Sequence, residues 1–137
     1  MIVIDASALT GFLLTRPSAL DVAVALAGEP DPDPFHAPDL IEPETLNALR
    51  RLARRGTVSA ERATHAVGVL GAFPLIRYPH SPLRGRVWDL RDELSAYDAM
   101  YLALAEGLDG SVLLTADREL AARARRSLGA EGVRLVE

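Results

Sequence analysis

The chain has 137 residues, 49% of them hydrophobic, which is the size of one domain with a core that needs no covalent staples. The absence of cysteine excludes disulfides, thiolate zinc sites and cysteine nucleophiles, and the three histidines lack the spacing of a zinc site. The net charge of −4 excludes a globally basic nucleic-acid binder, and because all 15 basic residues are Arg, lysine chemistry is excluded too.

Apolar runs and helix breakers divide the chain into alternating strands and helices. Short β-branched or apolar runs predict strands at 2–4, 35–37, 75–78, 111–115 and 133–136. Helical periodicity, caps and first-turn prolines predict helices at 6–14, 17–27, 42–55, 59–72, 83–93, 97–108 and 117–128. Alternation of this kind is typical of a parallel sheet covered by helices, which is an α/β sandwich.

The chain shows no sign of a second domain or of a membrane segment. The proline-rich stretch at 30–34 predicts a loop and is too short to separate two cores. No apolar run reaches the roughly 18 residues that a membrane span needs, and the first residues lack the basic segment of a signal peptide. We therefore expect a single cytoplasmic domain over residues 1–137, without membrane association.

Four acidic residues stand where predicted strands end or predicted helices begin. Asp5 and Asp117 follow strands, whereas Glu44 and Asp98 lie in first helical turns. Ligands of an open parallel sheet bind beyond the carboxyl ends of its strands, so these positions are candidates for a functional site. Asp98 also shares a face with the apolar stripe of its helix, which directs it toward the interior.

Each of these acids, taken singly, is also explained as a helix cap or as a favourable partner of a helix dipole. Taken together, in a chain without lysine, they favour a divalent cation, which offsets the repulsion among converging carboxylates. Oxygen ligands of this kind favour Mg²⁺ or Mn²⁺. Such a site is suited to activating water for attack on a phosphodiester.

The sequence segments around the acids are more specific than the acids alone. They read VIDASAL at 3–9, APDL and ETLNAL within 37–49, LSAYDAMYLALAE at 94–106 and LLTADREL at 113–120. In this order and spacing they resemble the motifs of PIN-domain ribonucleases, in particular the VapC toxins of toxin–antitoxin pairs. The segment at 94–106 is the most specific of the four.

The resemblance implies a three-layer α/β/α sandwich around a central parallel sheet, with the four acids at one end. It also implies a Mg²⁺-dependent endoribonuclease, with Mn²⁺ as a substitute, that cuts structured RNA such as transfer or ribosomal RNA. The protein would be the toxin of a VapBC-like pair, would be neutralised by a VapB-like antitoxin, and would form a homodimer.

The resemblance further assigns roles to individual residues. Asp5, Asp98 and Asp117 would hold Mg²⁺ directly or through water, and Glu44 would complete the pocket and orient the attacking water. Glu42 is a second acid beside Glu44, but an asparagine three residues after Glu44 favours Glu44. The residues implied as hydrogen-bond partners of the acids are Ser7, Asn47 and Thr115.

Arginines near the second segment supply positive charge that an acidic nuclease needs. On a helix, Arg51 and Arg55 share the face of Glu44, so we expect them to contact RNA phosphates. A solvated helix end, where cations suit the dipole, explains them equally well. Farther along, we expect the arginines at 84, 86 and 91 to pair with acids at 89, 92 and 93. We expect Trp88 in the core or at a subunit contact.

Two other functions stay open at this stage. A PIN scaffold that binds RNA or a protein without cutting would show the same motifs, because a motif does not prove a competent site. A phosphotransfer domain with Asp5 as phosphoacceptor is the other alternative. Such domains normally set a lysine against the phosphoryl group, and this chain has none.

Overall fold

The computed structural model describes residues 1–15 and 35–136; the helix expected at 17–27 and the loop expected at 30–34 lie outside them. In the described part, five parallel strands form one sheet in the order β3-β2-β1-β4-β5. The strands are β1 (Ile2–Ile4), β2 (Phe35–Pro38), β3 (Leu75–Tyr78), β4 (Val112–Thr115) and β5 (Val133–Leu135).

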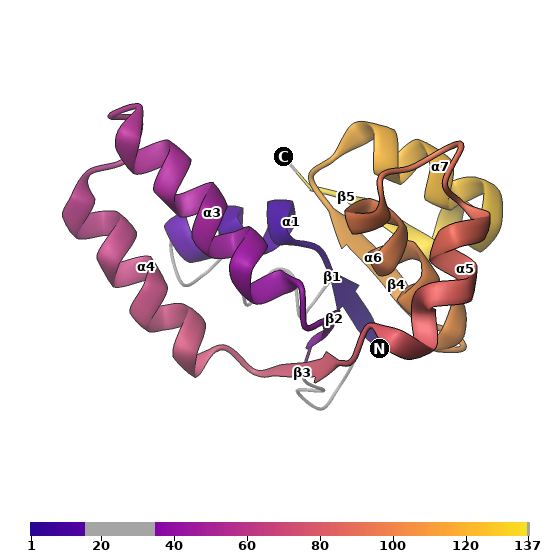
Figure 1. Ribbon diagram of the computed structural model, residues 1–137. Coiled ribbons are helices and arrows are strands. Elements are labelled where there is room, and N and C mark those ends of the chain that lie inside the picture. Colours follow the sequence, from indigo (N-terminus) through magenta and orange to yellow (C-terminus); the bar gives the residue numbers. More distant parts are fainter. Residues whose placement is uncertain (16–34, 137) are drawn as a thin grey trace.

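Helices cover both faces of this sheet, as the three-layer α/β/α sandwich requires. Their bounds are α1 (Ala6–Leu14), α3 (Ile41–Arg54), α4 (Ala60–Ala72), α5 (Arg84–Asp89), α6 (Ala96–Gly107) and α7 (Arg118–Leu128). Figure 1 shows α3 and α4 on one side of the sheet and α5, α6 and α7 on the other. The predicted fold class is therefore confirmed.

The central strands are buried on both faces, and this sets their composition. In β4, the last three residues are buried and apolar except for Thr115, whereas edge strand β3 has an exposed middle. Parallel strands covered on both faces read as continuous apolar runs, which explains why β1 and β4 were evident from the sequence. The core includes Leu9 of α1 and Leu102 of α6, both fully buried.

Strand β1 lies between β2 and β4, and this placement creates the site. Ile4 of β1 is in register with Leu114 of β4, and the backbone N–H of Asp5 donates to the Leu114 carbonyl oxygen at 3.1 Å. The carboxyl ends of the two strands therefore lie side by side. The chain passes from β1 to β2 on one side of this pair and from β4 to β5 on the other, so the direction of the connections reverses between β1 and β4. Open α/β sheets bind ligands at such a position.

One predicted element differs from the structure. The helix expected at 83–93 is a 3₁₀ turn at Ser81–Leu83 followed by the short α5, because the chain turns at Leu90. Leu90 is buried in the core, and residues 91–94 form further turns before Ser95 caps α6. The burial of Leu90 fixes this turn, and helical periodicity alone does not reveal it.

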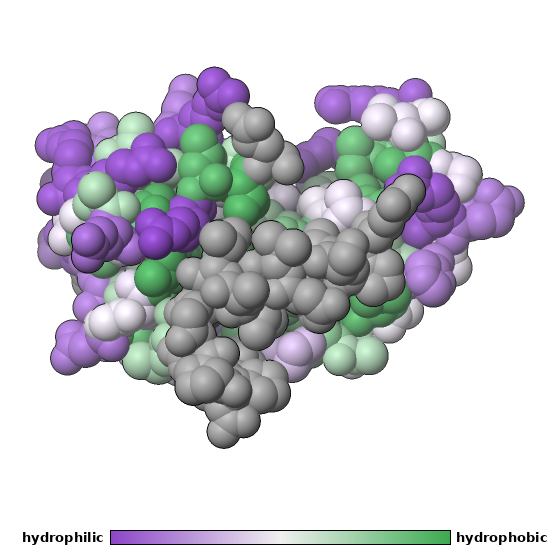
Figure 2. All heavy atoms as spheres, turned by 180° about the vertical axis from the view of Figure 1, so that it is seen from behind, coloured by the Kyte–Doolittle hydropathy of each residue, from purple (hydrophilic) through white to green (hydrophobic). Residues whose placement is uncertain are grey.

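The outer surface combines charged ends with apolar patches. The face opposite to the view of Figure 1 has hydrophilic residues gathered toward its ends and apolar residues between them (Figure 2). No helix of the described residues has the length and apolar character needed to cross a membrane.

Candidate active site

A pocket of about 390 Å³ is lined by all four predicted acids, Asp5, Glu44, Asp98 and Asp117. They come from four places in the fold: the end of β1, the first turn of α3, the first turn of α6 and the residue that caps α7. Up to 112 residues separate them in the chain (117 − 5). The sheet thus brings the four acids to one end of the molecule, where the sequence analysis placed them.

Asp5 is the most enclosed of the four, with 4% of its surface exposed. Its Oδ1 accepts hydrogen bonds from the Ser7 hydroxyl at 2.7 Å and from the Ala8 backbone N–H at 2.9 Å, and its Oδ2 accepts one from the Thr115 hydroxyl. Burial raises the pKa of Asp5, while these three donors partly offset the rise. Asp5 therefore caps α1 and also lines the pocket.

Ser7 and Thr115 extend this network to the last acid. The Thr115 hydroxyl accepts the backbone N–H of Asp117 at 2.9 Å, and the Ser7 hydroxyl accepts that of Ala116 at 2.9 Å. Asp117 caps α7 through its Oδ1, which accepts from two backbone N–H groups of that helix. The structure thus places Ser7 and Thr115 beside the acids, as the resemblance implied.

Glu44 is held by a residue that the sequence analysis did not single out. The Tyr101 hydroxyl of α6 donates to Glu44 Oε1 at 2.7 Å. Burial raises the pKa of Tyr101, so its hydroxyl keeps its proton and acts as a donor. Burial, with a contribution from the charge of Asp5, also raises the pKa of Glu44. By contrast, Glu42 forms an ion pair with Arg77 at 2.6 Å and does not line the pocket.

Asp98 shows how strongly the acids affect one another. It is half-buried, and the Ser95 hydroxyl accepts its backbone N–H at 3.1 Å in the capping arrangement. Burial, followed by the charges of Asp117, Glu44 and Asp5, raises the pKa of Asp98 to about 6. Carboxylates that disfavour each other's ionisation in this way favour a cation between them.

Positive charge borders the same pocket. Arg51 of α3 and Arg55, the residue that follows this helix, line it, as their shared helix face predicted. The charge of Arg51 offsets part of the rise in the pKa of Glu44. Asn47, one turn from Glu44, is exposed and is not among the residues that line the pocket. The structure therefore does not place Asn47 beside the acids.

Two further polar residues line the pocket and were missed from the sequence. Tyr101 lies three residues after Asp98, a spacing that puts both on one helix face and was the available signal. Thr10 lines the pocket from α1, one turn after Ala6, and its buried hydroxyl has no hydrogen-bond partner among the described residues. No sequence pattern separates Thr10 from an ordinary helical threonine.

In the segment before α6, one expectation is wrong and one of two alternatives for another is excluded. Arg86 pairs with Glu106 of α6, at 2.7 Å from Nε, and not with an acid of its own segment. Packing of α5 on α6 makes Glu106 the nearer partner. Trp88 is 66% exposed, so it is not a core residue; the Arg91 guanidinium lies over its ring at 4.8 Å. A subunit contact through Trp88 stays a prediction.

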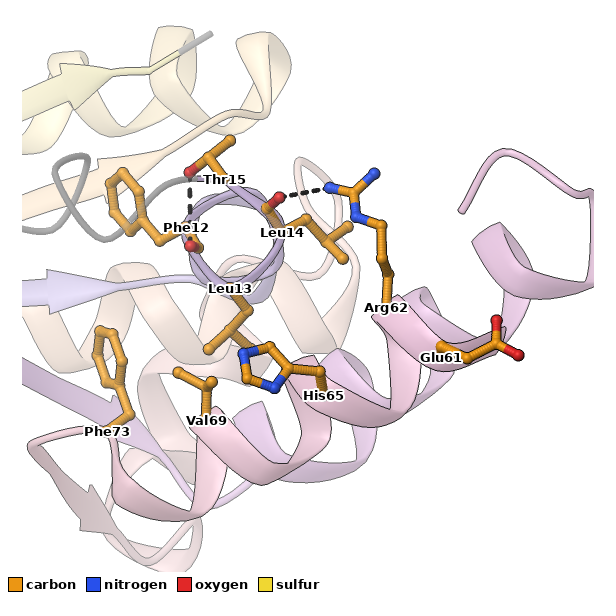
Figure 3. Close-up of a pocket in the computed structure, with 9 residues that line it drawn as sticks. All are labelled: Phe12, Leu13, Leu14, Thr15, Glu61, Arg62, His65, Val69 and Phe73. Carbon is orange, nitrogen blue, oxygen red and sulfur yellow. Dashed lines mark hydrogen bonds between the residues drawn. The ribbon is translucent and has the colours of Figure 1, made fainter. Parts of the chain in front are cut away.

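A second hollow, of about 490 Å³, lies between the C-terminal half of α1 and α4. Figure 3 shows Leu13, Val69 and Phe73 facing this space, while the Glu61 carboxylate points away from α1. Arg62 crosses above it and donates to the Leu14 carbonyl oxygen at 2.7 Å. Among the described residues that line this hollow, Glu61 is the one carboxylate.

The donor set of the acid pocket fits a hard divalent cation. Its described lining supplies four carboxylates and no His or Cys, and burial together with the neighbouring charges raises the pKa of Asp98. Within residues 1–15 and 35–136, no three His, Cys, Asp or Glu side chains are already arranged closely enough to hold a metal ion. Mg²⁺ retains several of its waters, so it binds through one or two carboxylates and water-mediated contacts rather than a dedicated protein cage.

Comparison with known proteins agrees with this site. The family model of the PIN domain matches residues 2–126. VapC ribonuclease Mb0985 of Mycobacterium bovis is 39% identical over 120 residues, 88% of each chain. Ribonuclease VapC12 of Mycobacterium tuberculosis is 37% identical over 121 residues, 88% of this chain and 90% of that protein.

A solved structure gives the same result. The crystal structure of PAE2754 from Pyrobaculum aerophilum aligns with a TM-score of 0.64 and 31% identity, over 89% of this chain and 83% of that one. The resemblance that the four sequence segments carried is thus confirmed by matches that span most of the chain. The chain belongs to the PIN-domain family, where its relatives of similar length are VapC ribonucleases.

Proposed function

We propose that this protein is an endoribonuclease, the toxin of a VapBC-like pair, and that it uses Mg²⁺, with Mn²⁺ as a substitute. The observation that carries the proposal is the meeting of Asp5, Glu44, Asp98 and Asp117 in one pocket. The family match supports the reaction class, and the all-carboxylate donor set supports the choice of metal.

In this proposal Asp5, Asp98 and Asp117 hold the cation, directly or through water. A cation held there would lower the pKa of a water molecule and offset negative charge on the phosphodiester that this water attacks. Asp5 is kept in place by Ser7, Thr115 and the Ala8 N–H, so its orientation is set before substrate arrives. Preorganised carboxylates cost little rearrangement during the reaction.

Glu44 orients the attacking water in this scheme. Its Oε1 accepts the Tyr101 hydroxyl, which leaves Oε2 as the oxygen that can accept a hydrogen bond from water. In the hydrolysis, a water oxygen bonds to phosphorus, one phosphorus–oxygen ester bond breaks, and the leaving oxygen takes up a proton. One RNA fragment then ends in a hydroxyl group at the cut, and the other fragment ends in the phosphate.

Arg51 and Arg55 are proposed to bind phosphates next to the scissile bond. Both line the acid pocket from the C-terminal end of α3 and the residue after it, and neither forms an ion pair with another described residue within 4 Å. Their guanidinium groups are suited to bidentate phosphate contacts. The two arginines supply positive charge beside the acidic pocket, although the chain as a whole has a net charge of −4.

The partners follow from the same proposal. The substrate is RNA, and a structured RNA such as transfer or ribosomal RNA is the expected class. A VapB-like antitoxin neutralises the enzyme, and two copies of the chain form a homodimer in the cytoplasm. The PIN match over residues 2–126 supports a single domain.

The phosphotransfer alternative loses support in the structure. Both carboxylate oxygens of Asp5 accept hydrogen bonds from side chains or backbone, and Asp5 is 4% exposed. Attack on phosphorus would require this enclosed carboxylate to leave its donors, whereas a water-mediated contact with a cation would not, and the chain has no lysine to receive the phosphoryl charge. A PIN scaffold that only binds RNA is distinguished by experiment.

The test is cleavage of RNA by the purified chain, free of antitoxin, in Mg²⁺, Mn²⁺ or EDTA. We expect discrete fragments of transfer or total RNA that require the cation and disappear with Asp98→Asn. Asp109→Asn, an exposed acid outside the acid pocket, is the matched control and should cut like wild type. Intact RNA in every lane, from folded protein that binds Mn²⁺, would contradict the nuclease and favour the binding scaffold.

A further inference from the structure

The hydroxyl of Tyr101 links the two helices that face each other across the acid pocket. Tyr101 belongs to α6 and is 1% exposed, and its hydroxyl reaches Glu44 Oε1 on α3 at 2.7 Å. The two residues are 57 apart in the chain. The contact therefore depends on the packing of the fold rather than on a local turn.

Glu44 depends on this one contact more than Asp5 and Asp117 depend on any single contact of theirs. Asp5 has three donors, and Asp117 is held by the backbone of its own helix. For Glu44, the hydrogen bond from Tyr101 is the one side-chain hydrogen bond formed with the described residues. Glu44 also has a longer, more flexible side chain than the aspartates, so an unheld carboxylate samples several rotamers.

The guanidinium of Arg51 competes with Tyr101 for the Glu44 carboxylate. Arg51 lies two turns farther along α3 on the same face, lines the same pocket and attracts Glu44 electrostatically. A Glu44 side chain released from Tyr101 is free to turn toward Arg51. It would then leave the acids and at the same time occupy a guanidinium that the substrate needs.

We propose that Tyr101 is a positioning residue for RNA cleavage. Its hydroxyl keeps the Glu44 carboxylate among the acids by occupying Oε1, so that Oε2 serves the reacting water and Arg51 stays available to phosphate. This inference rests on the proposed ribonuclease function. The ordinary explanation is that a buried tyrosine hydroxyl needs any acceptor, in which case Glu44 serves Tyr101 and catalysis does not depend on the bond.

The test compares Tyr101→Phe with Tyr97→Phe in the full chain. Tyr97 lies on the same helix, is 61% exposed and does not line the pocket, so its variant controls for loss of a phenol. Phenylalanine fills the space of the Tyr101 ring, and thermal unfolding checks that both variants fold. We expect Tyr101→Phe to lower kcat about ten-fold, with KM for RNA within about two-fold of wild type.

A double-mutant cycle separates positioning from a structural effect. If Tyr101 acts through Glu44, then adding Tyr101→Phe to Glu44→Gln causes no further loss of kcat beyond about two-fold. An additional ten-fold loss on that background would overturn the proposal, as would an unchanged kcat for Tyr101→Phe alone.

A second readout keeps the inference separate from the ribonuclease proposal. Mn²⁺ is titrated into each protein by calorimetry, without RNA. We expect Tyr101→Phe to weaken Mn²⁺ binding at least about three-fold relative to Tyr97→Phe, because a carboxylate leaves the pocket. If wild type cuts no RNA, the ribonuclease proposal fails, but the Mn²⁺ titration still tests whether Tyr101 positions Glu44. Weaker Mn²⁺ binding by Tyr101→Phe than by Tyr97→Phe supports that role, and equal binding overturns it.

Discussion

The hydroxyl of Thr115 joins Asp5 to Asp117. It donates to Asp5 Oδ2 and accepts the backbone N–H of Asp117 at 2.9 Å. Thr115 is fully buried, and β1 and β4 end in register, so this bond links residues 110 apart in the chain. One hydroxyl thus sets the relative position of two proposed metal ligands.

Thr115→Val should therefore damage both stability and cleavage. Valine has a similar shape but no hydroxyl, so Asp5 Oδ2 and the Asp117 N–H both lose a buried partner. We expect a loss of about 1–3 kcal/mol in the free energy of unfolding and at least a ten-fold fall in kcat. Urea denaturation and RNA cleavage measure the two effects. Thr57→Val, at an exposed position, should change neither; equal effects of both substitutions would contradict the bridging role.

Replacing Asp98 should stabilise the protein while abolishing its activity. Burial and three neighbouring carboxylates raise the pKa of Asp98 from 3.8 to about 6 in the folded state. The folded protein thus binds this proton more tightly than the unfolded chain, so the stability from Asp98 is present below pH 3.8 and is lost as pH rises through 6. In EDTA at pH 7, we expect Asp98→Asn to unfold at higher urea than wild type.

The pH dependence and the metal dependence test this explanation. The difference between Asp98→Asn and wild type should close as the pH falls toward 4, where the wild-type carboxyl is protonated. Added Mg²⁺ should also narrow the difference in stability between Asp98→Asn and wild type at pH 7. A ligand that binds the folded wild type stabilises that protein selectively. A difference that stays constant from pH 4 to 7, or that favours wild type in EDTA, would contradict the repulsion among the four acids.

Arg51→Ala should weaken RNA binding rather than chemistry. Arg51 lines the acid pocket, whereas Arg54 of the same helix is exposed and does not line it, so Arg54→Ala is the matched control. We expect KM to rise several-fold and kcat to stay within about two-fold. The slope of log affinity against log salt should fall by about 0.7 for each lost phosphate contact. Identical salt slopes for the two variants would remove the phosphate role from Arg51.

His80 should stabilise the start of the helix that carries Glu44. Its Nε2 accepts the backbone N–H of Leu40 at 2.8 Å, and Leu40 precedes α3 with no side-chain cap of its own. We expect His80→Ala to cost about 1 kcal/mol in the free energy of unfolding and to speed amide exchange in the first turn of α3. His65→Ala, exposed on α4, should leave amide exchange in α3 unchanged. Unchanged exchange for both variants would show that His80 caps nothing.

Much of the fold was predictable because local chemistry sets the ends of its elements. Asp5, Ser95 and Asp117 each cap the helix that follows them, and Gly129, at φ 77°, ends α7 in a conformation that glycine adopts freely. The strands β1 and β4 were evident because they are apolar, except for Thr115 at the end of β4. These signals extend over a few residues, which is the range that sequence patterns report well.

The remaining features depend on contacts between distant elements. The bond from Tyr101 to Glu44 and the ion pair of Arg86 with Glu106 require the packed helices, and no periodicity marks them. The exposure of Trp88 has the same origin, because an apolar residue type does not state which face of a short helix meets the core. The acids of the site were predictable, whereas the residues that hold them in place were only partly so.

The strand order also has a consequence for synthesis on the ribosome. Strand β1 leaves the ribosome first, yet its partner β4 and the acids Asp98 and Asp117 belong to the later part of the chain. When β1, β2 and β3 have just left the ribosome, the emerged part of the growing chain contains only Asp5 and Glu44 of the four acids. Asp98 and Asp117, which complete the pocket, have not yet emerged. The pocket proposed to cut RNA is therefore completed only when the part of the chain that carries Asp98 and Asp117 has been synthesised.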